Sequence, residues 1–372
     1  MSGIIDAIVT VLLFIIVLGG LVLAHEFGHF LTARLARVRV LEFGIGFPPR
    51  AKVLGRGGET LYTLNWLPIG GFVKLEDEDG QGSDDPRAFG RSRLPVKVAI
   101  LLAGVLMNLF LSLAIFFTIA AVATPYVGLK FGSVEPGSPA EGAGLIATDA
   151  IVSVNGERFD FFSPYDGTSI IDALRANAGK AVVIGVVHQD GSSGQINPTL
   201  RTQAEIDAGK GALGIRAGDK GFEALFQHEY TGRPPVEAAG IAWSETTRWF
   251  GLILGGLGDL VGSVVANPTA APPVSGPVGI ATELGSVFRD SGPIMTLYIA
   301  GILSANLALV NVLPFPPLDG GRILVLLLKA LPFGRRISAR AEQATYAIGF
   351  LLMFAFLIWI TVFDVIRGVT GG

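Results

Sequence analysis

The sequence contains no cysteine, few charged residues and only four histidines. Without cysteine, the chain forms no disulfide, offers no thiolate to a metal and has no cysteine nucleophile. Charged residues make up 16% of its 372 residues and hydrophobic residues 50%, whereas roughly a quarter of a soluble domain is charged. The net charge is −3 without a run rich in Lys and Arg, which gives no reason to expect a nucleic-acid partner. We therefore expect a membrane protein, in which any bound metal is held by histidine and carboxylate side chains.

Four apolar stretches are long enough to cross a bilayer, which requires about 20 mostly apolar residues. They are residues 4–30, 98–123, 294–313 and 344–363. The first lacks a basic leader and a small-residue cleavage site, so we expect it to remain in the mature protein as a span. A fifth stretch, residues 249–266, carries apolar residues at helical spacing with glycines and an aspartate on other faces. That pattern is typical of a helix lying on the membrane surface, so four spans are expected in total.

Lysine and arginine are concentrated in two of the segments that connect these spans. The segment between spans one and two is rich in both, and the short segment between spans three and four carries Lys329, Arg335, Arg336 and Arg340. The positive-inside rule places both segments in the cytoplasm. Both termini and the long segment 124–292 are then expected outside, because long domains are translocated largely regardless of their charge.

Residues 127–201 alternate short apolar runs with glycine turns, which predicts a small, mainly β domain. Two of its stretches, residues 132–145 and 149–156, resemble a bacterial PDZ domain. Such domains bind extended peptide ends by adding them as a strand to their sheet. We therefore expect a PDZ domain over residues 125–203 that binds peptide ends, the alternative being a domain that serves only as a plug or spacer. Residues 204–240 are rich in glycine, proline and charge, and are expected to be a linker.

The strongest chemical signal is the run His25-Glu26-Phe27-Gly28-His29, in the last turns of the first span. Two histidines four residues apart lie on one face of a helix and can bind one zinc ion. Glu26 lies beside them, placed to act as general base on the water that the metal binds. In a lipid-exposed position these polar groups would cost on the order of a few kcal/mol, which favours a functional role. The alternative is that the histidines mark the membrane interface and Glu26 caps a neighbouring group.

A catalytic zinc site usually has three protein ligands and a water, so a third ligand is required. Asp319 is the best candidate, because it directly follows span three in Asn311-Val-Leu-Pro-Phe-Pro-Pro-Leu-Asp319, where prolines end the helix. Spans one and three are expected to run in the same direction, so they deliver His29 and Asp319 to the same side of the membrane. The alternative role for Asp319 is to cap the helix that follows it.

These motifs, in this order, resemble the site-2 protease family, and more narrowly the bacterial regulator-of-sigma-E proteases. The order is H-E-x-x-H in the first span, a PDZ-like domain after the second and N-x-x-P-x-P-x-L-D-G after the third. The resemblance extends over nearly the whole chain and includes residues 70–74, 103–108 and 275–280. One departure is the single recognisable PDZ domain, where some relatives carry two, which leaves the arrangement that admits substrate open.

The resemblance implies an intramembrane zinc metalloprotease. It implies that His25, His29 and Asp319 hold Zn²⁺, and that Glu26 activates the zinc-bound water for attack on a peptide bond. It also implies that Asn306 and Asn311 engage the substrate backbone. The alternative role of these two side chains is an interhelical hydrogen bond, which is also the role we expect for Asn108.

The stretch 51–75 alternates apolar and polar residues around two glycine pairs, which predicts β-hairpins beside the active site. In the family, such strands enter the membrane and bind an extended substrate; the alternative is an ordinary cytoplasmic hairpin. The expected fold is thus a polytopic α-helical membrane protein with four transmembrane helices, a membrane-associated β-hairpin region and an inserted extracytoplasmic PDZ domain. Its expected parts are residues 1–124, the PDZ domain 125–203, a linker with the amphipathic helix 204–291, and residues 292–372.

The resemblance implies regulated intramembrane proteolysis in a bacterial inner membrane, with the active site toward the cytoplasm. The implied substrates are single-span membrane proteins, such as anti-sigma-factor-like proteins or remnant signal peptides. Two alternatives remain at this stage. One is a non-catalytic PDZ scaffold in the membrane, and the other is an unrelated H-E-x-x-H membrane peptidase whose third ligand is a glutamate on a later helix.

Overall fold

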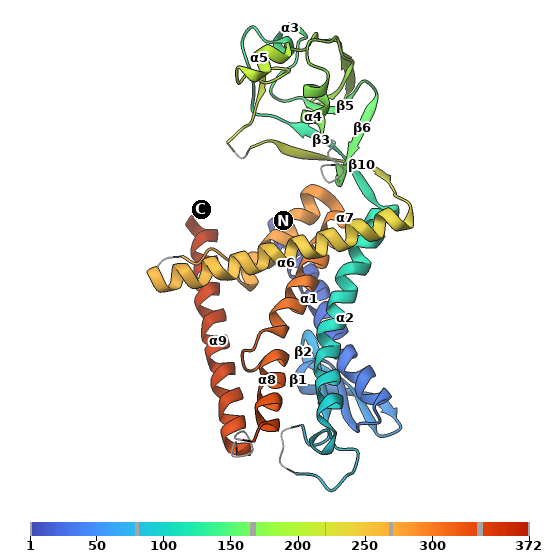
Figure 1. The fold of residues 1–372 in the computed structure, drawn as a ribbon, viewed down its shortest axis with the longest axis vertical. Coiled ribbons are helices and arrows are strands. Elements are labelled where there is room, and N and C mark those ends of the chain that lie inside the picture. Colours follow the sequence, from blue (N-terminus) through green and yellow to red (C-terminus); the bar gives the residue numbers. More distant parts are fainter. Residues whose placement is uncertain are drawn as a thin grey trace. The chain divides into compact units, whose positions relative to one another are not determined.

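The computed structural model describes residues 2–78, 82–163, 169–219, 221–267, 271–332 and 338–370. Two of the basic residues used for the expected orientation, Arg335 and Arg336, lie outside these ranges. The chain forms two compact units, one from Met1–Phe116 with Ala242–Gly372 and the other from Phe117–Ile241. Long helices make up most of the first unit, and a β-sheet dominates the second (Figure 1).

Among the described residues, five helices are long and apolar enough to cross a membrane, judged by length and composition. They are α1 (Ser2–Leu35), α2 (Leu94–Val122), α6 (Pro235–Ala266), α7 (Pro277–Val312) and α9 (Ala339–Thr370). A helix satisfies its backbone hydrogen bonds internally, which is what an apolar segment needs inside lipid. The helix beyond the four expected is α6, whose part in the first unit runs crosswise to α1, α7 and α9 (Figure 1). Four spans with α6 on the membrane surface remain a prediction.

The end of α7 and the start of α8 (Asp319–Ala330) are folded tightly against each other. A Cβ atom at Gly320 would lie 2.0 Å from the carbonyl oxygen of Val312. A Cβ atom at Gly321 would lie 2.6 Å from the carbonyl oxygen of Phe315. Only glycine permits this approach. Asp319 is the first residue of α8, and the cap position is taken by Leu318. The alternative role of Asp319 as the helix cap is therefore wrong, because the helix begins one residue earlier than that role requires.

The strands β1 (Val40–Gly57) and β2 (Thr60–Leu75) form an antiparallel pair within the first unit. The first part of β1 is contacted on both of its edges: Val40 to Ile45 lie opposite Leu75 to Gly71, and Glu42 to Ile45 also lie opposite Leu61 to Leu64. The last part of β2 then packs against α1, and the backbone N–H of Val73 donates to Glu26. The β region expected at 51–75 is thus larger, beginning at Val40, and its last segment borders the H-E-x-x-H motif.

Helices α1 and α2 approach each other closely at Gly28, inside the H-E-x-x-H motif. A Cβ atom at Gly28 would lie 2.4 Å from the carbonyl oxygen of Ala103. Below this crossing, α1, α2 and the β region share a buried apolar cluster. Its fully buried members are Ala33, Val38, Val40, Leu75, Phe89, Ile100 and Leu101. The cluster packs the two helices and the sheet together next to the motif.

The second unit contains a six-stranded sheet in the order β10-β3-β6-β5-β7-β8. Its strands are β3 (Thr124–Lys130), β5 (Ala150–Val154), β6 (Glu157–Asp160), β7 (Ile184–Val187), β8 (Ser193–Ile196) and β10 (Glu223–Thr231). The short strands β4 (Ser133–Val134) and β9 (Ile215–Arg216) pair separately, and the described part of the unit also contains three short helices. These helices are α3 (Pro139–Gly142), α4 (Ile170–Ala176) and α5 (Gln203–Asp207). The small β domain is present, while its assignment as a PDZ domain remains a prediction.

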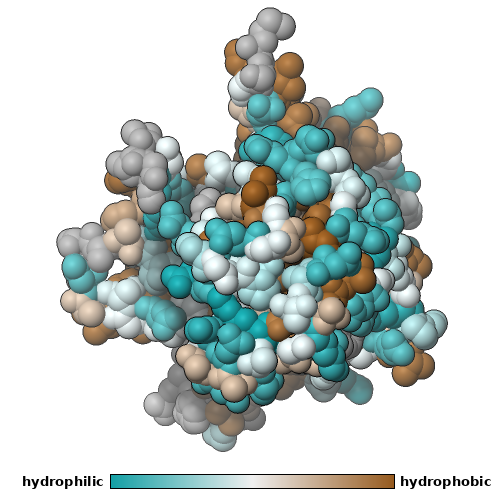
Figure 2. Space-filling model, turned by 90° about the horizontal axis from the view of Figure 1, so that it is seen from above, coloured by the Kyte–Doolittle hydropathy of each residue, from teal (hydrophilic) through white to brown (hydrophobic). Residues whose placement is uncertain are grey.

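Part of the stretch expected to be a linker, residues 204–240, belongs to this sheet. Strand β10 pairs with β3 from Glu223, opposite Lys130, to Thr231, opposite Thr124. As an edge strand it lacks the strong apolar alternation of a buried strand, because charged side chains are common on such edges. Figure 2 shows many hydrophilic residues, with hydrophobic ones between them, on the face of the molecule that it views.

We expect Asp364 on α9 to stabilise the first unit through the start of α7. Its carboxylate accepts hydrogen bonds from the backbone N–H groups of Gly276 and Gly279, at 3.1 and 2.8 Å. Asp364→Ala removes both acceptors and should cost roughly 1–3 kcal/mol, since buried donors lose their partner. Thermal unfolding in detergent should show a lower Tm than for the wild type. Asp290→Ala, at an exposed position, is the matched control, and equal Tm values for both variants would contradict this role.

Candidate metal centre

Helix α1 presents His25 and His29 on one face, one turn apart. Both are buried, with 7% and 8% of their surface exposed. Their rings meet edge to face with centroids 4.7 Å apart, and their Nε2 atoms are 3.0 Å apart. Two imidazoles buried this close together in an apolar helix have little access to water.

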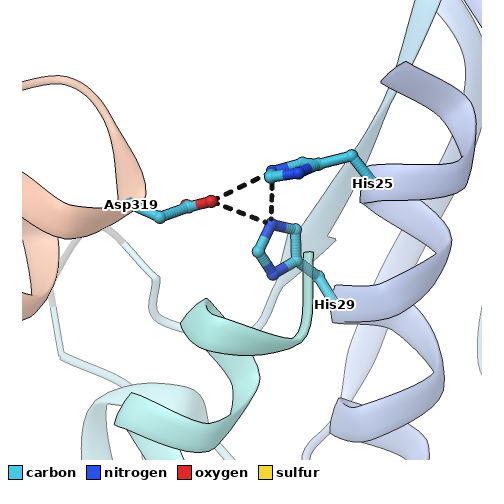
Figure 3. A group of neighbouring side chains, drawn as sticks. All are labelled: His25, His29 and Asp319. Atoms are coloured by element: carbon cyan, nitrogen blue, oxygen red, sulfur yellow. Dashed lines mark hydrogen bonds and ion pairs between the residues drawn. The ribbon is translucent and has the colours of Figure 1, made fainter. Parts of the chain in front are cut away.

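Asp319 enters the same space from the first turn of α8 (Figure 3). Its Oδ2 lies 3.0 Å from Nε2 of His25 and 3.4 Å from Nε2 of His29. Asp319 is itself buried, with 8% of its surface exposed. Residues nearly 300 positions apart in the chain thus form a compact group of three side chains, which we call the His-His-Asp cluster.

The donor atoms of this cluster fit a zinc ion. Ligands at 2.0–2.1 Å from a tetrahedral zinc are separated by about 3.3 Å, and the three observed separations range from 3.0 to 3.4 Å. His29 donates Nδ1–H to the carbonyl oxygen of Ile100 at 2.7 Å, which leaves a lone pair on Nε2 of the neutral ring. Oδ2 of Asp319 accepts no hydrogen bond from the described residues, despite its short distance to both rings. Lone pairs that face one another in a buried space are the arrangement that a bound cation satisfies.

Glu26 lies beside the cluster, on the adjacent face of α1. Its Oε2 accepts a hydrogen bond of 3.1 Å from the backbone N–H of Val73 on β2. A cavity of about 180 Å³ is lined by this glutamate, by His29 and by Asp319. The cavity is also bordered by Arg322, which forms an ion pair with Glu78 at 2.6 Å. The carboxylate of Glu26, two of the three candidate metal ligands and room for water therefore share one cavity.

The structure does not bring the two candidate substrate-binding asparagines into this cavity. Asn306 and Asn311 lie half-buried on α7, and neither is among the described residues that line it. Their expected contact with a substrate backbone therefore stays a prediction.

The structure also places Asn108 beside the His-His-Asp cluster, whereas only an interhelical hydrogen bond was expected of this residue. This side chain is fully buried on α2, and its Nδ2 lies 3.4 Å from Nδ1 of His25. In the sequence, the indication of a role for Asn108 was its position, because it is an amide in an otherwise apolar span and lies within a stretch that carries the family resemblance. That signal did not identify which helix the amide faces.

The sequence matches the family model described as peptidase family M50 over residues 13–356. A candidate zinc metalloprotease of Clostridium acetobutylicum is 30% identical over 354 residues, which cover 95% of this chain and 96% of the relative. The zinc metalloprotease RasP of Geobacillus kaustophilus is 26% identical over an alignment that covers 97% of this chain and 99% of the relative. A candidate chloroplastic membrane metalloprotease of Arabidopsis thaliana is 30% identical over an alignment that covers 94% of this chain and 78% of the relative. These similarities extend across both units of the chain.

We expect the purified protein to carry about one zinc ion per chain, measured by elemental analysis in detergent. Asp319→Asn replaces a charged oxygen ligand with a neutral amide, so it should lose most of its zinc during dialysis against a chelator. Asp259→Asn, on an exposed position of α6, should retain zinc as the wild type does. Full zinc occupancy in Asp319→Asn would remove Asp319 from the ligand set.

Proposed function

The chain belongs to peptidase family M50 and is an intramembrane zinc metalloprotease, and we propose that the His-His-Asp cluster is its metal centre. The observation that carries this proposal is the convergence of the three donor atoms beside a cavity that Glu26 lines together with His29 and Asp319. Membership of the family removes both alternatives, the non-catalytic scaffold and the unrelated membrane peptidase. It also supports the reading of the chain as a multi-pass membrane protein, with the lipid bilayer as its environment.

A zinc ion held by His25, His29 and Asp319 would lower the pKa of a bound water and polarise the carbonyl of the scissile peptide bond. Glu26 is the proposed general base, which accepts the proton of the attacking water and passes it to the leaving amine. The N–H of Val73 holds one carboxylate oxygen of Glu26. The other oxygen is then free to face the cavity, so the β region orients the base.

The last segment of β2 is the proposed binding edge for the substrate. Residues Gly71 to Leu75 pair with Val40 to Ile45 on one side, and Gly71, Phe72 and Val73 line the catalytic cavity. An extended peptide that adds to this edge would have its backbone beside Glu26. A transmembrane helix must unwind before its peptide bonds become accessible, and strand addition supplies alternative hydrogen-bond partners for the unwound backbone. We assign to Asn306 and Asn311, on α7, the same role of binding the unwound substrate backbone.

The proposed substrates are single-span membrane proteins, of the anti-sigma-factor-like or remnant signal-peptide kind. The second unit is the proposed PDZ domain, which would bind peptide ends by strand addition. The proposed location is a bacterial inner membrane, and the distribution of lysine and arginine supports an orientation with both termini and this domain outside the cytoplasm. The catalytic centre would then lie toward the cytoplasmic side.

We expect Glu26→Gln to retain zinc and to lose cleavage of a model single-span substrate in a gel assay. The amide keeps the size of the side chain and an oxygen for the Val73 N–H, but it cannot accept the proton of water. General-base catalysis commonly contributes about 10²–10⁴-fold, so the rate should fall at least by that factor. Glu283→Gln, exposed on α7, should cleave normally. Normal cleavage by Glu26→Gln would exclude Glu26 as the base.

The proposed orientation can be tested with single cysteines, because the natural chain has none. Asp190→Cys lies on the exposed surface of the second unit, and Arg93→Cys on the segment that precedes α2. In spheroplasts, a membrane-impermeant maleimide should label Asp190→Cys directly and Arg93→Cys only after permeabilisation. The reverse pattern would overturn the proposed topology while leaving the metal centre untouched.

A further inference from the structure

Helix α2 presents Ile100, Gly104 and Asn108 at four-residue spacing, and therefore on one face, toward the two histidines of α1. We infer that this face supports the metal centre, and that Asn108 is a positioning residue that orients His25 through its Nδ1 atom. The inference rests on the proposed role of the histidines as zinc ligands. Each of the three positions contributes in a different way, through a backbone carbonyl, an absent side chain and an amide.

The first contribution is visible as a hydrogen bond. The carbonyl oxygen of Ile100 accepts Nδ1–H of His29 at 2.7 Å. A proton on Nδ1 leaves Nε2 unprotonated, which is the form of imidazole that binds a metal. The backbone of α2 thus selects both the tautomer and the ring orientation of His29.

His25 needs an equivalent acceptor, because its Nε2 also faces the cluster. Among the described residues, Asn108 is the side chain that hydrogen-bonds its Nδ1, with Nδ2 at 3.4 Å. Oδ1 of the same amide is buried and has no hydrogen-bond partner among the described residues. A half-turn of the amide exchanges the two ends, so that Oδ1 accepts Nδ1–H of His25. If zinc is bound at Nε2 of His25, this orientation gives the Nδ1–H of His25 an acceptor, and it gives Oδ1 of Asn108 a hydrogen-bond donor.

The position of Asn108 is fixed independently of its side chain. Ser304 on α7 donates its hydroxyl to the backbone carbonyl of Asn108 at 2.8 Å. The asparagine is fully buried, with 0% of its surface exposed. Its amide therefore has little freedom other than rotation about its own terminal bond, which suits a group that orients a ligand.

Gly104 provides the space in which the rings meet. A Cβ atom at this position would lie 2.4 Å from Nε2 of His29 and 2.7 Å from Cε1 of His25. Any side chain would push both rings away from Asp319. The glycine and the asparagine, one turn apart, therefore act on the same pair of ligands.

The two possible roles of Asn108, packing between helices or orienting His25, predict different effects for two substitutions of this residue. Leucine has nearly the same shape as asparagine and no acceptor. Aspartate keeps an acceptor for His25 and adds a buried charge. If Asn108 only packs, leucine is tolerated and aspartate is disruptive; if Asn108 orients His25, the order is reversed, because carboxylates serve as acceptors for metal-bound histidines.

The test is the zinc affinity of purified full-length protein in detergent, measured by competition with a chromophoric chelator. Asn108→Leu should bind zinc about 10–100-fold more weakly than the wild type, and Asn108→Asp should bind it about as tightly as the wild type. Ser112→Ala, one turn further along α2 and also buried, is the control and should leave the affinity unchanged. Melting temperatures of the metal-free proteins show whether each variant is folded.

Wild-type affinity in Asn108→Leu would overturn the inference, as would an equally weakened affinity in folded Asn108→Asp. His25→Ala, measured in parallel, separates this inference from the proposed metal centre. If His25→Ala keeps its zinc, the metal centre itself is wrong. If His25→Ala loses zinc and Asn108→Leu does not, only the role of Asn108 fails.

Discussion

Three potential metal-binding atoms that converge in a buried, apolar space are the constraint on which the rest of this structure depends. The Nε2 atoms of His25 and His29 and the Oδ2 atom of Asp319 lie 3.0–3.4 Å apart. Burying three such polar atoms without a cation would be costly in a bundle of apolar helices. A zinc ion bound at the proposed centre would offset this cost and would also supply the site's reactivity.

Small residues make this convergence possible. Gly28 lets α1 approach α2, Gly104 leaves room for both imidazoles, and Gly320 lets α8 begin against the end of α7. Each replaces side-chain volume with close backbone contact, as is common where membrane helices pack. The proposed metal ligands come from two helices and the groups proposed to support them from a third, and glycines lie where these elements meet.

The β region connects the proposed catalytic base to the proposed substrate edge. The N–H of Val73 holds Glu26, and neighbouring residues of the same segment line the cavity. An open strand edge is tolerated at membrane depth only where it is covered by protein or lines a wet cavity. In this protein the segment packs against α1 and borders the cavity beside Glu26, which is the setting that such an edge requires.

Local patterns in the chain were enough to identify the zinc protease family and the four main apolar helices, because hydropathy and four-residue spacing are properties of short segments. The alignment of spans one and three also led to Asp319 as a partner of His25 and His29. Three features required the folded chain. Strand β10 has the composition of a linker and becomes a strand only by pairing with β3; Asp319 begins α8 instead of capping it; and Asn108 is an ordinary buried amide until α2 packs against α1 and places it beside His25. Pairing partners and side-chain neighbours across helices are set by long-range packing, which no single segment of the sequence encodes.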